Sequence, residues 1–308
     1  MKEAPRVLCA VDFSRANGAA FRNALAIAKR RSAKLDVVLA VPLSTRFNEG
    51  GRDRMALMTD LHRAAAADGV DVTVAVQQGD PAGLILLHAN SSNSRVPDLI
   101  VLGAPVRKGT ERLRFGSVAE RVLRVAPCPT LVVRASDLDV DGPAGPFERI
   151  LCPVDFSPAS VTSLGRAVEM LREGGRVLRL LHVLNGPSPL SVPRLARTSA
   201  NDNATTELRQ AAWRRLQELA PVSSELRGKV YLEVTVGPVG DQIARAAIKM
   251  DADVVVVGVS SRGMVGRLFG STTARVLRTV GCSVLAVPGI VGSSRREDQR
   301  PETRRAAA

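Results

Sequence analysis

Short β-branched runs alternate with segments of helical spacing along almost the whole chain. Residues 70–77 place valine at every second position, which is the period of a half-buried strand. Residues 16–31 instead gather alanine and isoleucine on one helical face. Such patterns predict, in the first half, strands at 7–11, 35–41, 70–77, 99–102 and 130–133, and helices at 16–31, 53–67, 80–89 and 117–125.

The second half repeats this order of elements. Its patterns predict strands at 149–154, 176–184, 230–236, 254–258 and 283–287, and helices at 159–172, 207–219, 239–250 and 272–280. Strands that alternate with helices indicate a parallel sheet with right-handed crossovers and helices on both faces. Each half is therefore predicted to be a five-stranded, doubly wound α/β unit.

The two halves are copies of each other. Val-Asp-Phe-Ser ends the first predicted strand of both, and its aspartates, Asp12 and Asp155, lie 143 positions apart. Ser117 and Ser271, which open the last helix of each half, lie 154 positions apart, so the second half carries a net insertion of 11 residues. We assign this insertion to residues 185–206, which are rich in Pro, Ser, Asn and Thr and are predicted to form a mobile loop.

Repeats of this length indicate duplicated domains rather than a solenoid. We expect a first domain over 1–135, a linker over 136–147, a second domain over 148–289 and a disordered basic tail over 290–308. No apolar run approaches the roughly 18–20 residues of a membrane helix, and no signal peptide is recognisable. The expected location is cytoplasmic, away from membranes.

Composition narrows the possible functions. The chain has 308 residues and only 3% aromatic side chains, so its cores are aliphatic and stacking on single-stranded nucleic acid is disfavoured. A net charge of +13 suits a phosphate-bearing partner, although a solvated surface explains it equally well. The three histidines are scattered, and no metal site is expected. The cysteines are predicted to be reduced core thiols: Cys9, Cys128, Cys152 and Cys282.

Two glycine-containing loops have the composition of an anion cradle. The strand at 254–258 ends in Gly258, a loop with Arg262 follows, and Gly270-Ser271 opens the next helix. Backbone N–H groups and the positive end of a helix dipole favour phosphate in such a place. The first half repeats the arrangement between Gly103 and Gly116-Ser117. The two serines are the predicted helix N-caps.

With these residues the chain resembles the universal stress protein family in its tandem form. The resemblance covers about residues 5–134 and 148–288 and rests on the Val-Asp-Phe-Ser and Gly-Ser segments of both halves. It implies strand order 3-2-1-4-5 in each half, the Rossmann-like fold of adenine-nucleotide alpha-hydrolases, and an ATP site. It also implies a dimeric assembly, formed either by two chains or by the two halves as an internal pseudo-dimer.

The resemblance implies that ATP, with or without Mg, lies where strands 1 and 4 of a half meet. In the second half the implied nucleotide-binding residues are Val154, Asp155, Val183, Gly258, Ser261, Arg262, Gly270, Ser271 and Thr272. In the first half they are Val11, Asp12, Val41, Gly103, Gly116 and Ser117.

Both loops depart from the pattern of ATP-binding members, which is Gly, two residues, Gly, nine residues, Gly, then Ser or Thr. Val106 replaces the second glycine in the first half, and a β-branched residue is a poor occupant of a left-handed position. In the second half Ser261 replaces it and the loop is one residue short. We therefore favour the C-terminal site. Asp155 has an alternative role in an Asx-turn or helix cap, and Val183 in ordinary core packing.

Two functions remain in competition. One is a stress-response protein that binds ATP in its C-terminal half and acts through protein partners. The other is a tandem scaffold whose altered sites no longer bind nucleotide. An enzyme is disfavoured because we find no Walker lysine, no paired carboxylates and no nucleophile–base pair, so no catalytic residue is assigned. Nucleic-acid binding is a minor alternative.

Overall fold

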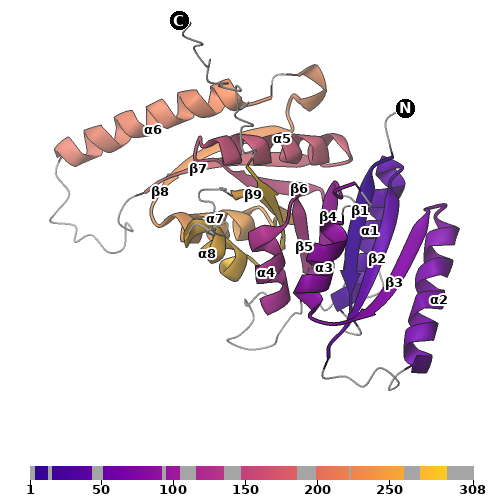
Figure 1. The fold of residues 1–308 in the computed structure, drawn as a ribbon. Coiled ribbons are helices and arrows are strands. Elements are labelled where there is room, and N and C mark those ends of the chain that lie inside the picture. The colour runs from indigo at the N-terminus through magenta and orange to yellow at the C-terminus, as the bar shows by residue number, and fades with distance from the viewer. Residues whose placement is uncertain are drawn as a thin grey trace, which may run out of the picture.

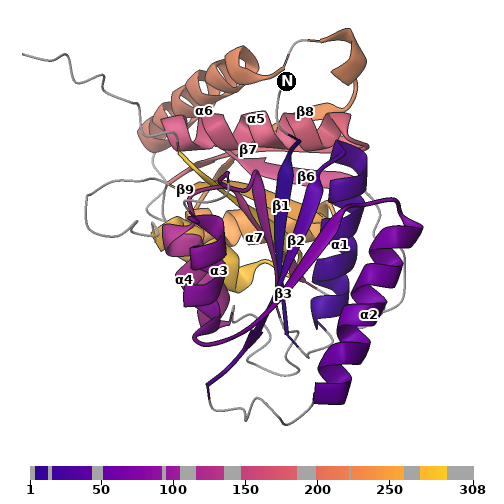
Figure 2. The same cartoon turned by 45° about the vertical axis from the view of Figure 1, so that its right-hand side comes forward.

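The computed structural model describes residues 4–12, 16–43, 51–91, 95–104, 116–134, 147–185, 199–221, 223–259 and 271–289. Strands and helices alternate through both halves (Figures 1 and 2). The first half contains β1 (Arg6–Val11), α1 (Ala16–Arg31), β2 (Lys34–Val41), α2 (Gly51–Ala67), β3 (Val72–Gln78), α3 (Pro81–Ala89), β4 (Leu99–Ala104), α4 (Ser117–Val125) and β5 (Thr130–Arg134). The second contains β6 (Arg149–Pro153), α5 (Pro158–Arg172), β7 (Val177–Leu184), α6 (Ser199–Leu219), β8 (Val230–Val236), α7 (Val239–Lys249), β9 (Val254–Val259), α8 (Ser271–Thr279) and β10 (Ser283–Pro288).

The prediction of a loop over residues 185–206 is partly wrong. Residues 199–206 belong to α6, whereas residues 186–198 lie outside the described part of the chain. The start of α6 lacks an apolar stripe, which hid it from pattern analysis. The helix is anchored further along by Ala212 and Leu216, which are buried. Extending an anchored helix adds one hydrogen bond per residue without a new nucleation step, so a polar segment can follow.

The predicted domain boundaries stay a prediction. Residues 136–146 of the predicted linker and the whole tail at 290–308 lie outside the described residues. Among the described residues, no helix is both long enough and apolar enough to cross a bilayer.

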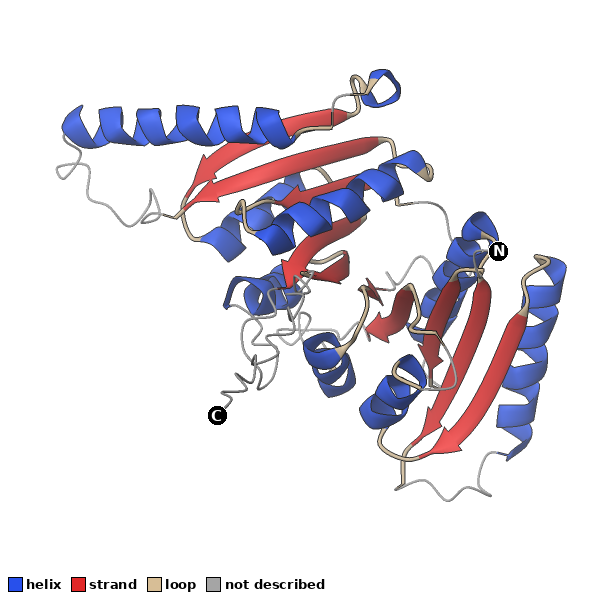
Figure 3. Ribbon diagram, turned by 45° about the horizontal axis from the view of Figure 1, so that its top comes forward, coloured by secondary structure: helices blue, strands red, loops and turns tan. Residues whose placement is uncertain are grey.

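The sheet confirms the doubly wound α/β prediction. Strands follow the order β3-β2-β1-β4-β5 in the first half and β8-β7-β6-β9-β10 in the second, and neighbours within a half are parallel. The two halves then meet at their last strands, because β5 pairs antiparallel with β10, with Val132 opposite Val284. One ten-stranded sheet therefore runs through the molecule (Figure 3).

Helices cover both faces of this sheet. Helices α1, α2, α5 and α6 pack on one face, and α3, α4, α7 and α8 on the other. Both aliphatic cores contain residues from both halves, as expected for parallel strands that are buried on two sides. All four cysteines are free, and burial raises the pKa of the Cys9 and Cys152 thiols to about 12, so both remain protonated core residues.

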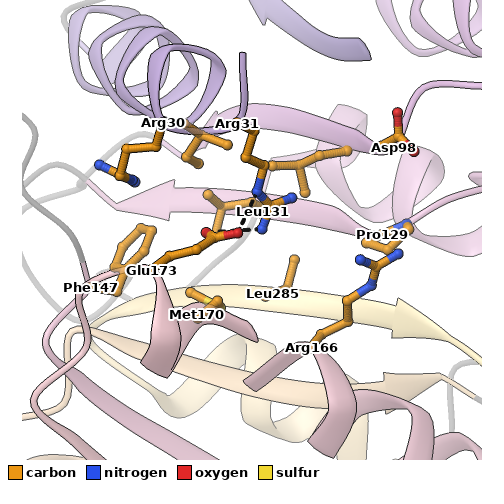
Figure 4. A pocket seen from close by; sticks show the side chains of 12 residues that line it. Arg30, Arg31, Asp98, Pro129, Leu131, Phe147, Arg166, Met170, Glu173 and Leu285 are labelled. Carbon is orange, nitrogen blue, oxygen red and sulfur yellow. Dashed lines mark hydrogen bonds and ion pairs between the residues drawn. The ribbon is translucent and has the colours of Figure 1, made fainter. Parts of the chain in front are cut away.

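An ion pair crosses the seam between the halves (Figure 4). The Nε and Nη2 groups of Arg31, at the end of α1, donate hydrogen bonds to the two carboxylate oxygens of Glu173 at 2.8 and 3.1 Å. Glu173 follows α5 and stands 143 positions after Arg30, so it is the counterpart of Arg30 in the repeat. A self-pairing of the first half would bring arginines together here. The exchange of arginine for glutamate favours pairing of unlike halves.

The cavity below this ion pair is small. Leu131 of β5 and Leu285 of β10 line it together with Met170 of α5, and its volume is about 30 Å³. Such a volume holds about two water molecules and no organic ligand. The seam is therefore a packing interface.

We predict a measurable coupling between Arg31 and Glu173. In a double-mutant cycle of Arg31→Ala and Glu173→Ala, the coupling free energy of unfolding should be about 1 kcal/mol, because the pair is bidentate and only 21% and 30% exposed. The pair Arg63–Asp60 on α2, exposed at 74% and 67%, is the control and should give at most about 0.5 kcal/mol. Urea unfolding supplies both values. Equal couplings for the two pairs would contradict a special role at the seam.

Candidate functional site

The sheet opens between β6 and β9. Their ladder contains only the pairs Ile150–Val254 and Leu151–Val255, whereas the matching ladder of β1 and β4 continues for two further residues, to Ala10. Pro153 is the counterpart of Ala10 and has no N–H to donate. The N–H of the next residue, Val154, donates to Leu181 of β7 at 2.8 Å, so by alternation the nitrogen of Pro153 faces β9. The proline therefore ends the ladder early.

A cleft of about 260 Å³ lies beyond this opening. It is formed by the carboxyl ends of β6, β7 and β9 and by the first turns of α5, α7 and α8. The lining residues are Pro153, Val154, Asp155, Ser157, Ser160, Leu181, Val183, Val239, Ile243, Val257, Gly258, Thr273 and Val276. Because strand order reverses beside β6, this is the switch point at which open α/β sheets bind ligands. Three helix N-termini give it a positive potential.

Asp155 closes a tight turn at the rim of the cleft. Its Oδ1 accepts hydrogen bonds from the N–H of Ser157 at 3.0 Å and from the Ser157 hydroxyl at 2.5 Å. Ser157 in turn caps α5 by accepting the N–H of Ser160 at 3.2 Å. The predicted alternative, an Asx-turn before the helix, is therefore present.

The same turn keeps Asp155 ionised. Partial burial raises the pKa of the carboxyl, but the hydrogen bonds from the hydroxyl and N–H of Ser157 lower it more, so the pKa lies below its ordinary value. A depressed pKa means that these bonds favour the folded chain above the ordinary carboxyl range and lose that contribution as the pH falls through the folded pKa. At neutral pH the rim carries a carboxylate.

Phe156 links this turn to α6. Its backbone has a φ of 64°, a left-handed conformation that is unusual for an aromatic residue. The His182 ring lies 4.6 Å away, centroid to centroid, and Arg215 of α6 stands over the ring at 4.1 Å. The Nδ1 atom of His182 lies 2.7 Å from the carbonyl oxygen of Val154, which makes Nδ1–H the donor. The cation–π contact with Arg215 and the ring contact with His182 therefore hold Phe156, and with it the turn that contains Asp155.

Gly258 is required by packing. A Cβ atom at this position would lie 2.5 Å from the carbonyl carbon and oxygen of Ala159 and 2.8 Å from the nitrogen of Ser160. The end of β9 thus touches the backbone of the first turn of α5. Its lack of a side chain is explained by the fold, with or without a ligand.

The structure brings four of the sequence-predicted residues together. Val154, Asp155, Val183 and Gly258 line one cleft. Ser271 and Thr272 begin α8, but their side chains lie outside the description, as do Ser261, Arg262 and Gly270 altogether. Sequence analysis did not assign several lining residues to the site, although Ser157 belongs to the Val-Asp-Phe-Ser segment: Pro153, Ser157, Ser160, Leu181, Val239, Ile243, Val257, Thr273 and Val276.

In the first half, Val11 is buried and Asp12 is exposed at the corresponding strand end, and Gly103 lies in β4. The prediction of Ser117 as N-cap is wrong. Gly116 is the N-cap, with φ −63° and ψ 150°, and Ser117 is the first helical residue. Helix α8 likewise begins at Ser271 rather than after it.

Val41 is not the counterpart of Val183. The N–H of Gly79 donates to the Val41 carbonyl at 2.9 Å, just as that of Gly237 donates to Leu184 at 3.0 Å. Val41 therefore matches Leu184. A shift of one residue along a strand turns the side chain to the other face of the sheet, so Val41 does not face the side that Val183 does.

Comparisons with known proteins agree on one family. The model of the Universal stress protein family matches residues 4–134 and again 146–288. A Staphylococcus aureus protein, provisionally named a universal stress protein, is 33% identical over 149 residues, which cover 44% of this chain and 87% of the relative.

Solved structures show the same fold over nearly the whole chain. A universal stress protein of Archaeoglobus fulgidus has a TM-score of 0.66 at 16% identity, covering 94% of this chain and 100% of its own. A Pseudomonas aeruginosa protein of unknown function has a TM-score of 0.68 at 21% identity, covering 93% of each chain.

We predict opposite effects for two glycine-to-alanine changes, one in β9 and one in α5. Gly258→Ala should lower the free energy of unfolding by about 1–3 kcal/mol, because its Cβ meets backbone atoms that cannot move independently. Gly165→Ala, within α5 and with no atom within 4 Å of its Cβ, should raise it by roughly 0.5–1 kcal/mol. Urea unfolding measures both. Wild-type stability in Gly258→Ala would disprove the contact between β9 and α5.

Proposed function

The chain belongs to the universal stress protein family, and from this premise we propose that its second half binds an adenine nucleotide, ATP, in the cleft between β6 and β9. The observation that carries the proposal is the opening of the sheet at Pro153 in front of three helix N-termini. The volume of the cleft, about 260 Å³, is close to the lower end of the ~300–1,000 Å³ typical of small-molecule sites.

The walls of the cleft suit the parts of a nucleotide. Leu181, Val183 and Val257 are buried aliphatic residues, and such a slot accepts a flat base. The Asp155 carboxylate lines the cleft and would accept a hydrogen bond from a base amino group or a ribose hydroxyl. The amides at the start of α8, from Ser271 onward, would bind the phosphates.

The charged groups near the cleft determine which cations could contact the phosphates of a bound nucleotide. Arg275 of α8 donates two hydrogen bonds to Asp241 of α7, at 3.0 and 2.7 Å, so it is neutralised locally. In the described residues no group of three or more His, Cys, Asp or Glu side chains could hold a metal ion. We therefore propose that Mg, where it accompanies ATP, is held by the phosphates and water.

The proposed role is binding rather than turnover. Asp155 is the one carboxylate among the described residues that line the cleft. The lining hydroxyl groups belong to Ser157, Ser160 and Thr273, and no histidine that could act as their base is among the described lining residues. We propose a cytoplasmic stress-response protein whose nucleotide occupancy is communicated to protein partners.

The rival function, a scaffold without nucleotide, is supported by a specific observation. Asp155 and Gly258 each have a structural task, in the Asx-turn and in the packing of β9 on α5. Their presence alone therefore does not require a ligand. Only a binding measurement separates the two functions.

We predict that Asp155→Asn weakens ATP binding about tenfold or more, whereas Asp12→Asn leaves it unchanged. The asparagine keeps an oxygen for Ser157, so the turn persists, but it replaces Oδ2 by an amide donor. Equilibrium dialysis of labelled ATP with Mg against the full chain gives the affinities. At a ligand concentration ~100 times the dissociation constant, the wild type should also gain about 2.7 kcal/mol in stability.

Two results would contradict this prediction. An effect of Asp12→Asn alone would move the site to the first half. The absence of saturable uptake at millimolar ATP by the wild type, with an unchanged melting temperature, would leave the scaffold as the function.

A further inference from the structure

The only tryptophan of the chain lies on the surface of α6. Trp213 is 41% exposed, while the core side of the helix is formed by Ala212 and Leu216. A protein with so few aromatic residues would be expected to bury a tryptophan, since a large apolar ring gains most from leaving water. Its position away from the core indicates a different task.

Trp213 lines an open groove on the surface of the second half. A groove of about 590 Å³ lies between α6 and β8, and besides Trp213 it is lined by Arg209, Gln210, Arg214 and Val234. Spacings of three and four residues bring Trp213 next to Arg209 and Gln210, and Arg214 next to Gln210, on one flank of the helix. Strand β8 is the last strand of the ten-stranded sheet, and Figure 1 shows α6 running alongside it at the outer end of the molecule.

The two arginines of the groove lack acidic partners among the described residues. Arg214 donates only a long hydrogen bond, 3.5 Å, to the carbonyl of Gln210, and Arg209 makes no ion pair there. The glutamates Glu207 and Glu218 of α6 do not line the groove. By contrast, the arginines on neighbouring elements of the same half are each paired with a glutamate: Arg166, Arg172, Arg176 and Arg179.

We propose that this groove docks an acidic segment of a partner protein. An apolar side chain of the segment packs on Trp213 and Val234, and its carboxylates pair with Arg209 and Arg214. Tryptophan and arginine are the residues that most often dominate protein–protein binding energy, and an arginine fork matches a carboxylate in two hydrogen bonds.

A protein segment fits better than nucleic acid. Single-strand binding surfaces present successive aromatic platforms along a basic track, and the described groove offers one ring. The proposal rests on the partner-mediated part of the proposed function and is independent of ATP binding, so it is tested without nucleotide.

The test uses the full chain and a display library of random peptides. Panning should enrich peptides that combine Asp or Glu with an apolar anchor. The enriched peptides, synthesised, should change the intrinsic fluorescence of Trp213, which reports on this groove alone because the chain has no other tryptophan. Binding should weaken with added salt, since the contacts are charged.

Variants assign the binding to the groove. The double change Arg209→Glu with Arg214→Glu should weaken peptide binding about tenfold or more, and Trp213→Ala should do the same, whereas Trp213→Phe should restore most of the affinity. Arg245→Glu, an exposed arginine on α7 outside the groove, is the matched control and should bind as the wild type does. Melting temperatures confirm that all variants fold; for those with Trp213 replaced, titration calorimetry gives the affinity.

Three results would overturn the proposal. They are failure to enrich any peptide, enrichment of peptides without acidic residues, and equal affinity of the groove variants and the control. Binding of a single-stranded oligonucleotide that displaces the peptides with a steeper salt dependence would identify a nucleic-acid surface instead.

Discussion

The antiparallel pairing of β5 with β10 is the interaction on which the arrangement of the molecule depends. Each half alone would end in an edge strand with unpaired N–H and C=O groups, which is a site for uncontrolled pairing. Joining the two edges removes this exposure and merges both aliphatic cores across the seam. It also brings the end of α1 to the end of α5, where Arg31 meets Glu173. β3 and β8 then remain as the terminal strands.

The sequence predicts the elements well because their periods are local. Alternating valines mark strands and apolar stripes mark helices, and α1 and α4 are found with the predicted ends. An internal pseudo-dimer of the halves was one of two alternatives that the resemblance implied, but the strands that join them were not predictable, since a last strand carries no local signal for its partner. The polar start of α6 was missed because it buries no stripe of its own. Val41 and Val183 were both assigned to the nucleotide site, but a shift of one position in the repeat places them on opposite faces of the sheet.

The candidate site was only partly predictable, for a different reason. Motif residues were recognised by type, and Asp155 and Gly258 do line the cleft. However, the Asx-turn already explains the aspartate at position 155, and the backbone contact with α5 already explains the glycine at position 258. The feature that opens the cleft is Pro153, and its signal was visible in the repeat as the exchange of alanine for proline. Backbone hydrogen bonding, rather than the motif, thus determines where there is room for a ligand.

The second copy differs from the first in ways that act together. Glu173 distinguishes the seam partners, Pro153 opens the cleft, and the insertion contributes the first residues of the longer helix α6. A series of contacts connects the cleft at Pro153 with helix α6. Phe156 sits between the cleft residues Asp155 and Ser157, and Arg215 of α6 stands over its ring. Phe156 is bonded directly to Asp155 and its backbone is held in the left-handed region, so its ring is the part of the chain through which a displacement of Asp155 would reach Arg215. Helix α6 is therefore the element on which cleft occupancy and partner docking would act in common.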